Sequence, residues 1–240
     1  TPQRNLPASA SATLTNAHLP LQCHSSEPDV GDMPLYLGTL ARTQPDKPAA
    51  IRPATGEVRT FRQLNDRSNQ LAQLLHARGL RRGGHVAMFV ENRLEFFDVV
   101  WACLRSGLFI TPINWHLSAS EAAYIVDNCD ARALIASGAL EQTAELGRLA
   151  PRCEIRLAPG GGAEGFEDFE SAIAAFPAAP LETEWLGTFM LYSSGTTGKP
   201  KGIKRPLAEA TLVEMGGSPS MQMLADMFGM NADTVYLSPA

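Results

Sequence analysis

The chain of 240 residues is 45% hydrophobic and 19% charged, which is typical of a globular protein and excludes a disordered or collagen-like one. Its 20 lysine and arginine residues against 25 aspartate and glutamate residues give a net charge of −5. No basic excess is therefore present to bind a nucleic acid. No run of about 18 apolar residues occurs, so no transmembrane segment is expected.

The cysteines and histidines form no metal-binding pattern. The four cysteines are widely spaced without a C-x-x-C pair, and the five histidines, His85 and His116 among them, carry no partner pattern. We therefore predict no zinc site and no protein-held metal. The same cysteine usage favours a reducing, cytoplasmic setting.

The chain divides into three regions by pattern. Residues 1–32 are polar and irregular and have neither the basic nor the apolar segment of a secretory signal, so they are predicted to be an irregular N-terminal extension. Residues 33–180 are predicted to form a first α/β subdomain. Residues 181–240 are predicted to begin a second, truncated subdomain.

Strands and helices alternate in the first subdomain. Capping boxes at Thr60–Gln63 and Ser118–Glu121 each predict the start of a helix. Strands are predicted at 49–51, 57–60, 85–90, 108–113, 133–136 and 154–157, and further helices after 92–95 and over about 139–149. In the helix after 92–95, one face is predicted to carry Leu94, Phe97, Trp101 and Leu104. This alternation predicts an α/β fold with a largely parallel sheet flanked by helices.

The second region begins with an apolar strand predicted at 188–192. A methionine-rich helix at about 219–229 and a strand at 234–237 are predicted to follow.

A glycine-rich stretch imitates a dinucleotide-binding fingerprint. Gly160, Gly162 and Gly165 match G-x-G-x-x-G after a predicted strand. The residues that follow include several carboxylates, which would repel the pyrophosphate that a helix N-terminus should attract: Glu164, Glu167, Asp168 and Glu170. We therefore interpret this stretch as a loop.

Residues 193–202 concentrate hydroxyl, glycine and lysine residues directly after the strand predicted at 188–192. Lys199, Lys201 and Lys204 are three of the four lysines in the chain. Backbone amides, hydroxyls and ammonium groups together suit a polyphosphate, whereas a flexible polar linker is the alternative on chemistry alone. The segment is not the usual nucleoside-triphosphatase loop, because Ser193 stands in place of the required glycine and Pro200 in place of serine or threonine.

The run Tyr192-Ser-Ser-Gly-Thr-Thr-Gly-Lys-Pro-Lys-Gly202 resembles the signature loop of the adenylate-forming superfamily, which includes acyl-CoA synthetases, adenylation domains and luciferases. The resemblance extends from about Leu35 to the end of the chain. It includes, in order, Pro45-Asp-Lys-Pro-Ala49, Thr60-Phe61, Gly84-His-Val-Ala87, Pro112-Ile-Asn114, and Glu121 with Tyr124-Ile-Val126.

The resemblance implies a site for ATP. It places Ser193, Ser194, Gly195, Thr196, Thr197 and Lys201 in contact with phosphate and uses Gly198 for the turn. It implies catalytic roles for Lys201 and Thr196, whereas Lys199 occupies a variable position. Mg²⁺ would be recruited mainly by ATP, and coenzyme A would accept the acyl group.

The resemblance also implies that the chain is the N-terminal part of the adenylate-forming fold, with the phosphate loop between strands and the C-terminal lid domain absent. Such a fragment is expected to be inactive alone. The implied reaction joins a small-molecule carboxylic acid, fatty or similarly lipophilic, to coenzyme A through an acyl-adenylate. The alternatives are an amino-acid or aryl-acid adenylation domain, or a catalytically silent nucleotide-binding fragment; a homodimer is left open.

Overall fold

The computed structural model describes residues 36–193, 199–215, 219–230 and 234–237. Its main sheet has six strands in the order β7-β6-β5-β3-β4-β8, and every neighbouring pair is parallel. These strands are β3 (His85–Phe89), β4 (Phe109–Pro112), β5 (Ala133–Ala136), β6 (Ile155–Ala158), β7 (Glu167–Asp168) and β8 (Thr188–Phe189). The sheet confirms the predicted α/β class.

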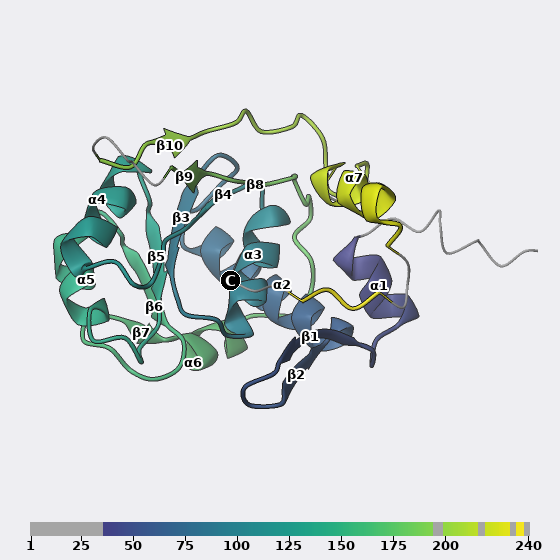
Figure 1. Ribbon diagram of the computed structural model, residues 1–240, viewed down its shortest axis with the longest axis horizontal. Helices are drawn as coiled ribbons and strands as arrows, with labels where there is room; N and C mark the ends of the chain where they lie inside the picture. Colours follow the sequence, from purple (N-terminus) through teal and green to yellow (C-terminus); the bar gives the residue numbers. More distant parts are fainter. Residues whose placement is uncertain (1–35, 194–198, 216–218, 231–233, 238–240) are drawn as a thin grey trace, which may run out of the picture.

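Helices cover both faces of this sheet (Figure 1). On one face lie α4 (Ala119–Asn128) and α5 (Thr143–Leu149), and on the other lie α2 (Phe61–Ala77), α3 (Glu95–Leu104) and α6 (Phe169–Ala174). The central strand β3 shows how the two cores form. Val86 and Met88 belong to the core beneath α2 and α3, whereas Ala87 and Phe89 belong to the core beneath α4. Because side chains alternate along a strand, the apolar run 86–89 of β3 fills both cores.

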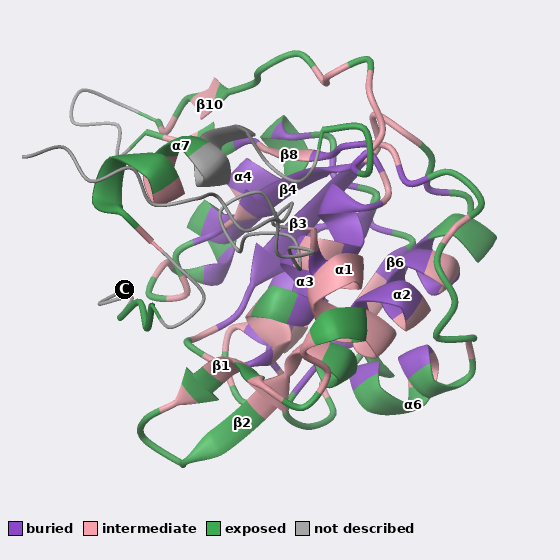
Figure 2. Ribbon diagram, turned by 90° about the vertical axis from the view of Figure 1, so that its right-hand side faces the viewer, coloured by how far each residue is buried: buried purple, intermediate pink, exposed green. Residues whose placement is uncertain are grey.

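Two predicted helix starts are present as capping boxes. In α2, the Thr60 side chain accepts from the Gln63 amide, and the Gln63 side chain accepts from the Thr60 amide. The same exchange joins Ser118 and Glu121 at the start of α4. Before α2, β1 (Pro48–Arg52) and β2 (Glu57–Thr60) form an antiparallel hairpin, which lies at the exposed edge of the molecule in Figure 2.

The predicted face of α3 is correct for Leu94 and Leu104, which are buried, and wrong for its other two residues. Phe97 is 39% exposed and Trp101 is only partly buried, whereas Asp98, Val99 and Cys103 are fully buried. The prediction placed only apolar residues on the buried face of this helix and therefore did not include Asp98. Asp98 nevertheless fits there because two arginines pair with it, Arg67 at 2.7 Å and Arg59 at 3.4 Å. The helix begins at Glu95, and its N-cap residue, Leu94, makes no side-chain capping hydrogen bond.

Several predicted boundaries differ from the structure. The helix predicted over 139–149 is present only from Thr143, as α5. The strand predicted at 188–192 is divided into β8, which joins the main sheet, and β9 (Leu191–Tyr192), which pairs with β10 (Gly202–Ile203). Residues 234–237, predicted as a strand, have no regular structure, and Val235 is 89% exposed. No strand in the described part of the chain pairs with them.

Three further elements complete the fold. They are α1 (Leu37–Thr43), which packs against α2, the edge strand β7, and α7 (Pro219–Phe228), which follows β10 in the chain. No pattern predicted α1, which begins without a side-chain cap, or β7 and β10, which have only two residues each. None of the helices in the described residues is long and apolar enough to cross a bilayer.

The glycine-rich stretch is a loop, as predicted. Gly160, Gly161 and Gly165 all have positive φ, and the residues after them enter β7 rather than a helix. Glu167 in β7 pairs with Arg78 at 2.6 Å. A Cβ on Gly160 would lie 2.0 Å from the Arg93 guanidinium, so the space beside this glycine is already filled.

Candidate functional site: the β9–β10 hairpin

The hairpin formed by β9 and β10 carries the segment predicted to bind phosphate. Gly202 lies opposite Tyr192, and Ile203 lies opposite Leu191. Beyond the last pair, the Ser193 amide donates to the Lys201 carbonyl oxygen at 3.0 Å. The Lys201 amide donates back to the Ser193 hydroxyl at 3.3 Å. The structure therefore brings two predicted phosphate-binding residues, Ser193 and Lys201, face to face at the base of the hairpin.

The remaining predicted site residues lie outside the described part of the chain. These are Ser194, Gly195, Thr196, Thr197 and Gly198.

The main sheet fixes where this hairpin lies. β8 pairs with β4, and the Met190 amide continues that pairing by donating to the Ile110 carbonyl at 2.9 Å. β9 follows at once, so the hairpin begins at the edge of the parallel sheet (Figure 1). Gly202 allows the return strand to approach closely: a Cβ there would lie 2.5 Å from the Met190 Sδ-methyl carbon and 2.9 Å from the Tyr192 ring.

Helix α4 contacts both arms of the hairpin. The Tyr192 hydroxyl donates to Asn128 Oδ1 at 2.7 Å, and the Tyr124 hydroxyl donates to the Pro200 carbonyl at 3.3 Å. Burial raises the pKa of the Tyr192 hydroxyl, which keeps it protonated and able to donate. The Lys199 ammonium lies 4.8 Å from the centre of the Tyr124 ring.

The three clustered lysines have different surroundings. Lys199 lies over Tyr124, and Lys204 lies 3.0 Å from His85 Nε2 and 4.6 Å from the centre of the Phe109 ring. Lys201 is exposed. No carboxylate within the described ranges forms an ion pair with any of the three. All three lysines are exposed residues, and Lys201 is the one for which the described part of the chain shows no ring or histidine contact.

His85, for which the sequence predicts no role, is a neutral partner of Lys204. Burial, reinforced by the Lys204 charge, lowers the pKa of His85 from 6.5 to about 4. The unprotonated Nε2 accepts from the ammonium group, and the imidazole stacks on Phe109 with ring centres 4.5 Å apart. This contact ties the chain after β10 to the start of β3.

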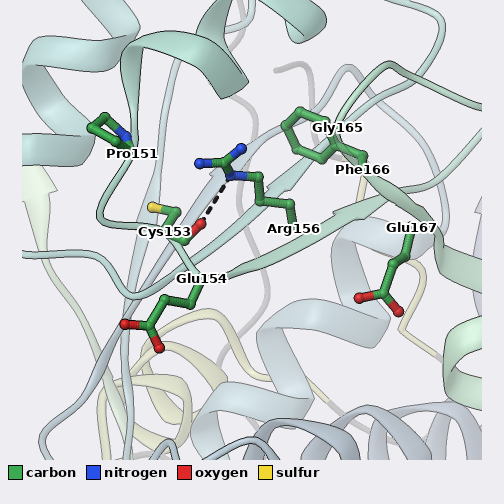
Figure 3. A pocket seen from close by; sticks show the side chains of 7 residues that line it. All are labelled: Pro151, Cys153, Glu154, Arg156, Gly165, Phe166 and Glu167. Atoms are coloured by element: carbon green, nitrogen blue, oxygen red, sulfur yellow. Dashed lines mark hydrogen bonds between the residues drawn. The ribbon is translucent and has the colours of Figure 1, made fainter.

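A separate hollow of about 390 Å³ lies at the opposite edge of the sheet, beside β6 and β7 (Figure 3). Its polar groups are already engaged. Arg156 Nε donates to the Cys153 carbonyl at 2.9 Å, as the dashed line in Figure 3 shows, and Glu167 pairs with Arg78. The strand order separates this hollow from the hairpin by the width of the sheet, so it is not part of the candidate site.

The site has no metal cage of its own in the described residues. No group of three His, Cys, Asp or Glu side chains in these ranges lies close enough to hold a metal ion. The groups that the hairpin does present, a hydroxyl and an ammonium, bind anions.

Comparison with known proteins decides the family. The sequence model of the family described as AMP-binding enzyme matches residues 38–240. The chain belongs to this family. Among its relatives, the fatty acid–[acyl-carrier-protein] ligase ScoC of Streptomyces coeruleorubidus is 30% identical over 171 residues, covering 68% of this chain and 30% of that protein.

Two further matches agree. The crotonobetaine/carnitine–CoA ligase of Proteus mirabilis is 31% identical over 178 residues, covering 68% of this chain and 34% of the ligase. The crystal structure of the anthranilate CoA ligase AuaEII with anthranoyl-AMP superimposes with a TM-score of 0.59 at 29% identity, over 73% of this chain and 36% of that one. The chain thus spans about a third of the length of these curated relatives.

Proposed function

We propose that the protein uses ATP to convert a carboxylic acid to an acyl-adenylate and then to an acyl-CoA. The observation that carries the proposal is the pairing of Ser193 with Lys201 at the base of the β9–β10 hairpin. Membership in the AMP-binding enzyme family and the ligase relatives support it.

In the proposed reaction, the segment carried by the hairpin holds the β- and γ-phosphates of ATP. The proposed phosphate contacts are Ser193, Ser194, Gly195, Thr196, Thr197 and Lys201, with Gly198 at the turn. Mg²⁺ would arrive with the ATP phosphates, since triphosphate oxygens are ligands that it prefers.

The first step transfers adenylate to the acid. A carboxylate oxygen of the substrate attacks the α-phosphorus, and the bond from that phosphorus to the bridging oxygen breaks, so pyrophosphate leaves with the electron pair. Hydroxyls and the Lys201 ammonium stabilise the charge that collects on the leaving group. In the second step the thiolate of coenzyme A attacks the acyl carbonyl and displaces AMP.

For the substrate we propose a fatty or related lipophilic acid. The ScoC relative is a fatty acid ligase, which favours this class. An aryl acid is the second candidate, because the AuaEII structure contains anthranoyl-AMP. We further propose a reducing compartment, since Cys103, Cys129 and Cys153 are buried free thiols.

Product analysis tests the proposal. The full-length protein would be incubated with ATP, Mg²⁺, coenzyme A and, in parallel, a C8 to C16 fatty-acid series, benzoate and anthranilate, and a set of amino acids. We expect AMP and acyl-CoA in equal amounts with a fatty acid. ADP and phosphate as products, or no product from any acid, would refute it.

Lys201→Ala tests the role of the ammonium group. It is expected to lower the rate of adenylation by about 100-fold, in the range found when one transition-state charge partner is removed. The dissociation constant of the acid should change little, because Lys201 acts on the leaving pyrophosphate. Equal loss in both quantities from a folded variant would contradict this role.

A further inference from the structure

Helix α4 holds the backbone on both sides of the hairpin base. Tyr124 and Asn128 lie four residues apart, on the same face of the helix. Asn128 accepts a hydrogen bond from the hydroxyl of Tyr192, the last residue of β9. Tyr124 donates a hydrogen bond to the carbonyl of Pro200 on the returning arm. One helical turn thus reaches both arms, across sequence separations of 64 and 76 residues.

The helix is a firm support for these two contacts. It begins with the Ser118–Glu121 capping box and buries Ala122, Ile125 and Val126 against the sheet. The rings of Tyr124 and Tyr192 are themselves partly buried against the same core. Because these rings are packed, their hydroxyl groups cannot move far, and a shift of the hairpin would break the hydrogen bonds.

Three successive backbone groups around Lys201 are held in place. The Pro200 carbonyl accepts from Tyr124, the Lys201 amide donates to Ser193 Oγ, and the Lys201 carbonyl accepts from the Ser193 amide. Pro200 has no amide hydrogen and a fixed φ, so its carbonyl is its only backbone hydrogen-bonding group. The Lys201 side chain therefore extends from a backbone that is fixed on both sides.

Within the described ranges, Tyr124 contacts Lys199 but not Lys201. Both lysines are exposed residues, but the Lys199 ammonium lies over the Tyr124 ring, where the negative face of the ring attracts it, whereas no ring contact is found for Lys201 among the described residues. Lys199 thereby adds a further contact between the returning arm and α4.

We propose that α4 positions the phosphate-binding lysine: Tyr124 and Asn128 fix the hairpin so that Lys201 meets the polyphosphate, and Lys199 serves as a tether to the Tyr124 ring. This rests on the proposed function for the identity of the ligand. The tether itself is a property of the fold and can be measured without any reaction.

The kinetic test uses paired variants in the full-length protein with ATP–pyrophosphate exchange. Tyr124→Phe removes only the hydroxyl and is expected to lower kcat/KM for ATP about fivefold, the effect of one neutral hydrogen bond. Tyr124→Leu also removes the ring and should lower it about 30-fold. The KM for the acid should stay within about twofold, because the displaced group contacts ATP; Asp127→Ala, on the outer side of α4, is the control.

The lysines give the second kinetic comparison. Lys199→Met should lower kcat/KM for ATP by about twofold to threefold, and Lys199→Arg should restore it, because arginine keeps the contact with the ring. Lys201→Met should lower it about 100-fold. Equal losses in Lys199→Met and Lys201→Met, or an unchanged Tyr124→Phe, would overturn the proposal.

Lysine labelling keeps the two proposals separate. Acetic anhydride in trace amounts, read by mass spectrometry, should modify Lys199 more slowly than Lys201 in the wild type and in Tyr124→Phe. In Tyr124→Leu the two rates should become equal. Slow Lys199 labelling with no exchange activity would refute the proposed function and leave the tether standing; equal labelling in the wild type would refute the tether, whatever the activity.

Discussion

Arg105 and Glu184 form a buried ion pair whose disruption should be costly. Arg105 is fully buried, with its Nε 2.8 Å from a Glu184 carboxylate oxygen. The rest of its guanidinium donates to Asn65 and to Ser68 Oγ, at 2.9 to 3.0 Å. Glu184 is 8% exposed and also accepts from the Tyr36 hydroxyl, whose pKa is raised to about 12 by burial and by this hydrogen bond.

Removing one member of this pair leaves a buried charge without its partner. Glu184→Gln is therefore expected to lower the free energy of unfolding by about 3 to 5 kcal/mol. Arg105→Met should cost a similar amount, since it leaves the carboxylate of Glu184 buried. In the double variant Arg105→Met/Glu184→Leu no charge remains, so its loss should be only about 1 to 2 kcal/mol, from the polar groups left without a donor.

Urea unfolding of the wild type, Arg105→Met, Glu184→Leu and the double variant gives the coupling energy; Glu184→Leu, like Glu184→Gln, leaves the Arg105 charge buried without its partner and should cost about 3 to 5 kcal/mol. We expect a coupling of at least about 3 kcal/mol, because each single substitution already incurs most of the cost. Slopes of the unfolding curves should be the same, which shows that the surface exposed on unfolding is unchanged. Losses that add to within about 0.5 kcal/mol would refute the reasoning, because independent sites behave in that way.

Other parts of the packing give further predictions. Gly187→Ala should lower the free energy of unfolding by about 2 to 4 kcal/mol, because its Cβ would lie 2.4 Å from the Cys103 carbonyl oxygen. Gly162→Ala is the control, since its Cβ meets nothing within 4 Å; equal urea midpoints would contradict the steric argument. Because the pKa of His85 is lowered from 6.5 to about 4 by burial and by Lys204, the unfolded chain binds more protons between these values. Stability should therefore fall by up to about 3 kcal/mol as the pH falls through this range, and His85→Gln should remove that dependence. An unchanged pH dependence in the variant would show that His85 is not buried in its neutral form. Burial raises the pKa of the Cys103 thiol, so iodoacetamide should modify it only after unfolding; alkylation in the native protein, read by mass spectrometry, would contradict the packing.

Local patterns predicted the elements that depend on local interactions. The capping boxes at Thr60 and Ser118 satisfy backbone amides within four residues, so sequence alone indicates where α2 and α4 begin. The apolar run of β3 predicts a strand buried on both faces. Asp98 shows the limit of this approach, because its burial depends on Arg59 and Arg67 from other elements.

In the candidate site, too, residues of a local motif could be predicted, whereas contacts made by packing could not. Ser193 and Lys201 belong to one short motif, and the sequence predicted both. The sequence assigns no role to Tyr124, which belongs to the family resemblance, or to Asn128, which belongs to no motif, because their contacts with the hairpin form only once α4 packs beside it. The sequence also did not predict that the apolar run 188–192 forms two strands. The division arises because the first part pairs with β4 and the second with β10.

Exchange of labelled pyrophosphate into ATP is the decisive test of the proposed adenylation, because it reports adenylate formation without requiring the later transfer to a thiol. The full-length protein would be assayed with fatty, aryl and amino acids and with no acid. We expect exchange that depends on a fatty acid, on Mg²⁺ and on Lys201. A folded protein that binds ATP but exchanges no pyrophosphate with any acid would contradict the proposed adenylation.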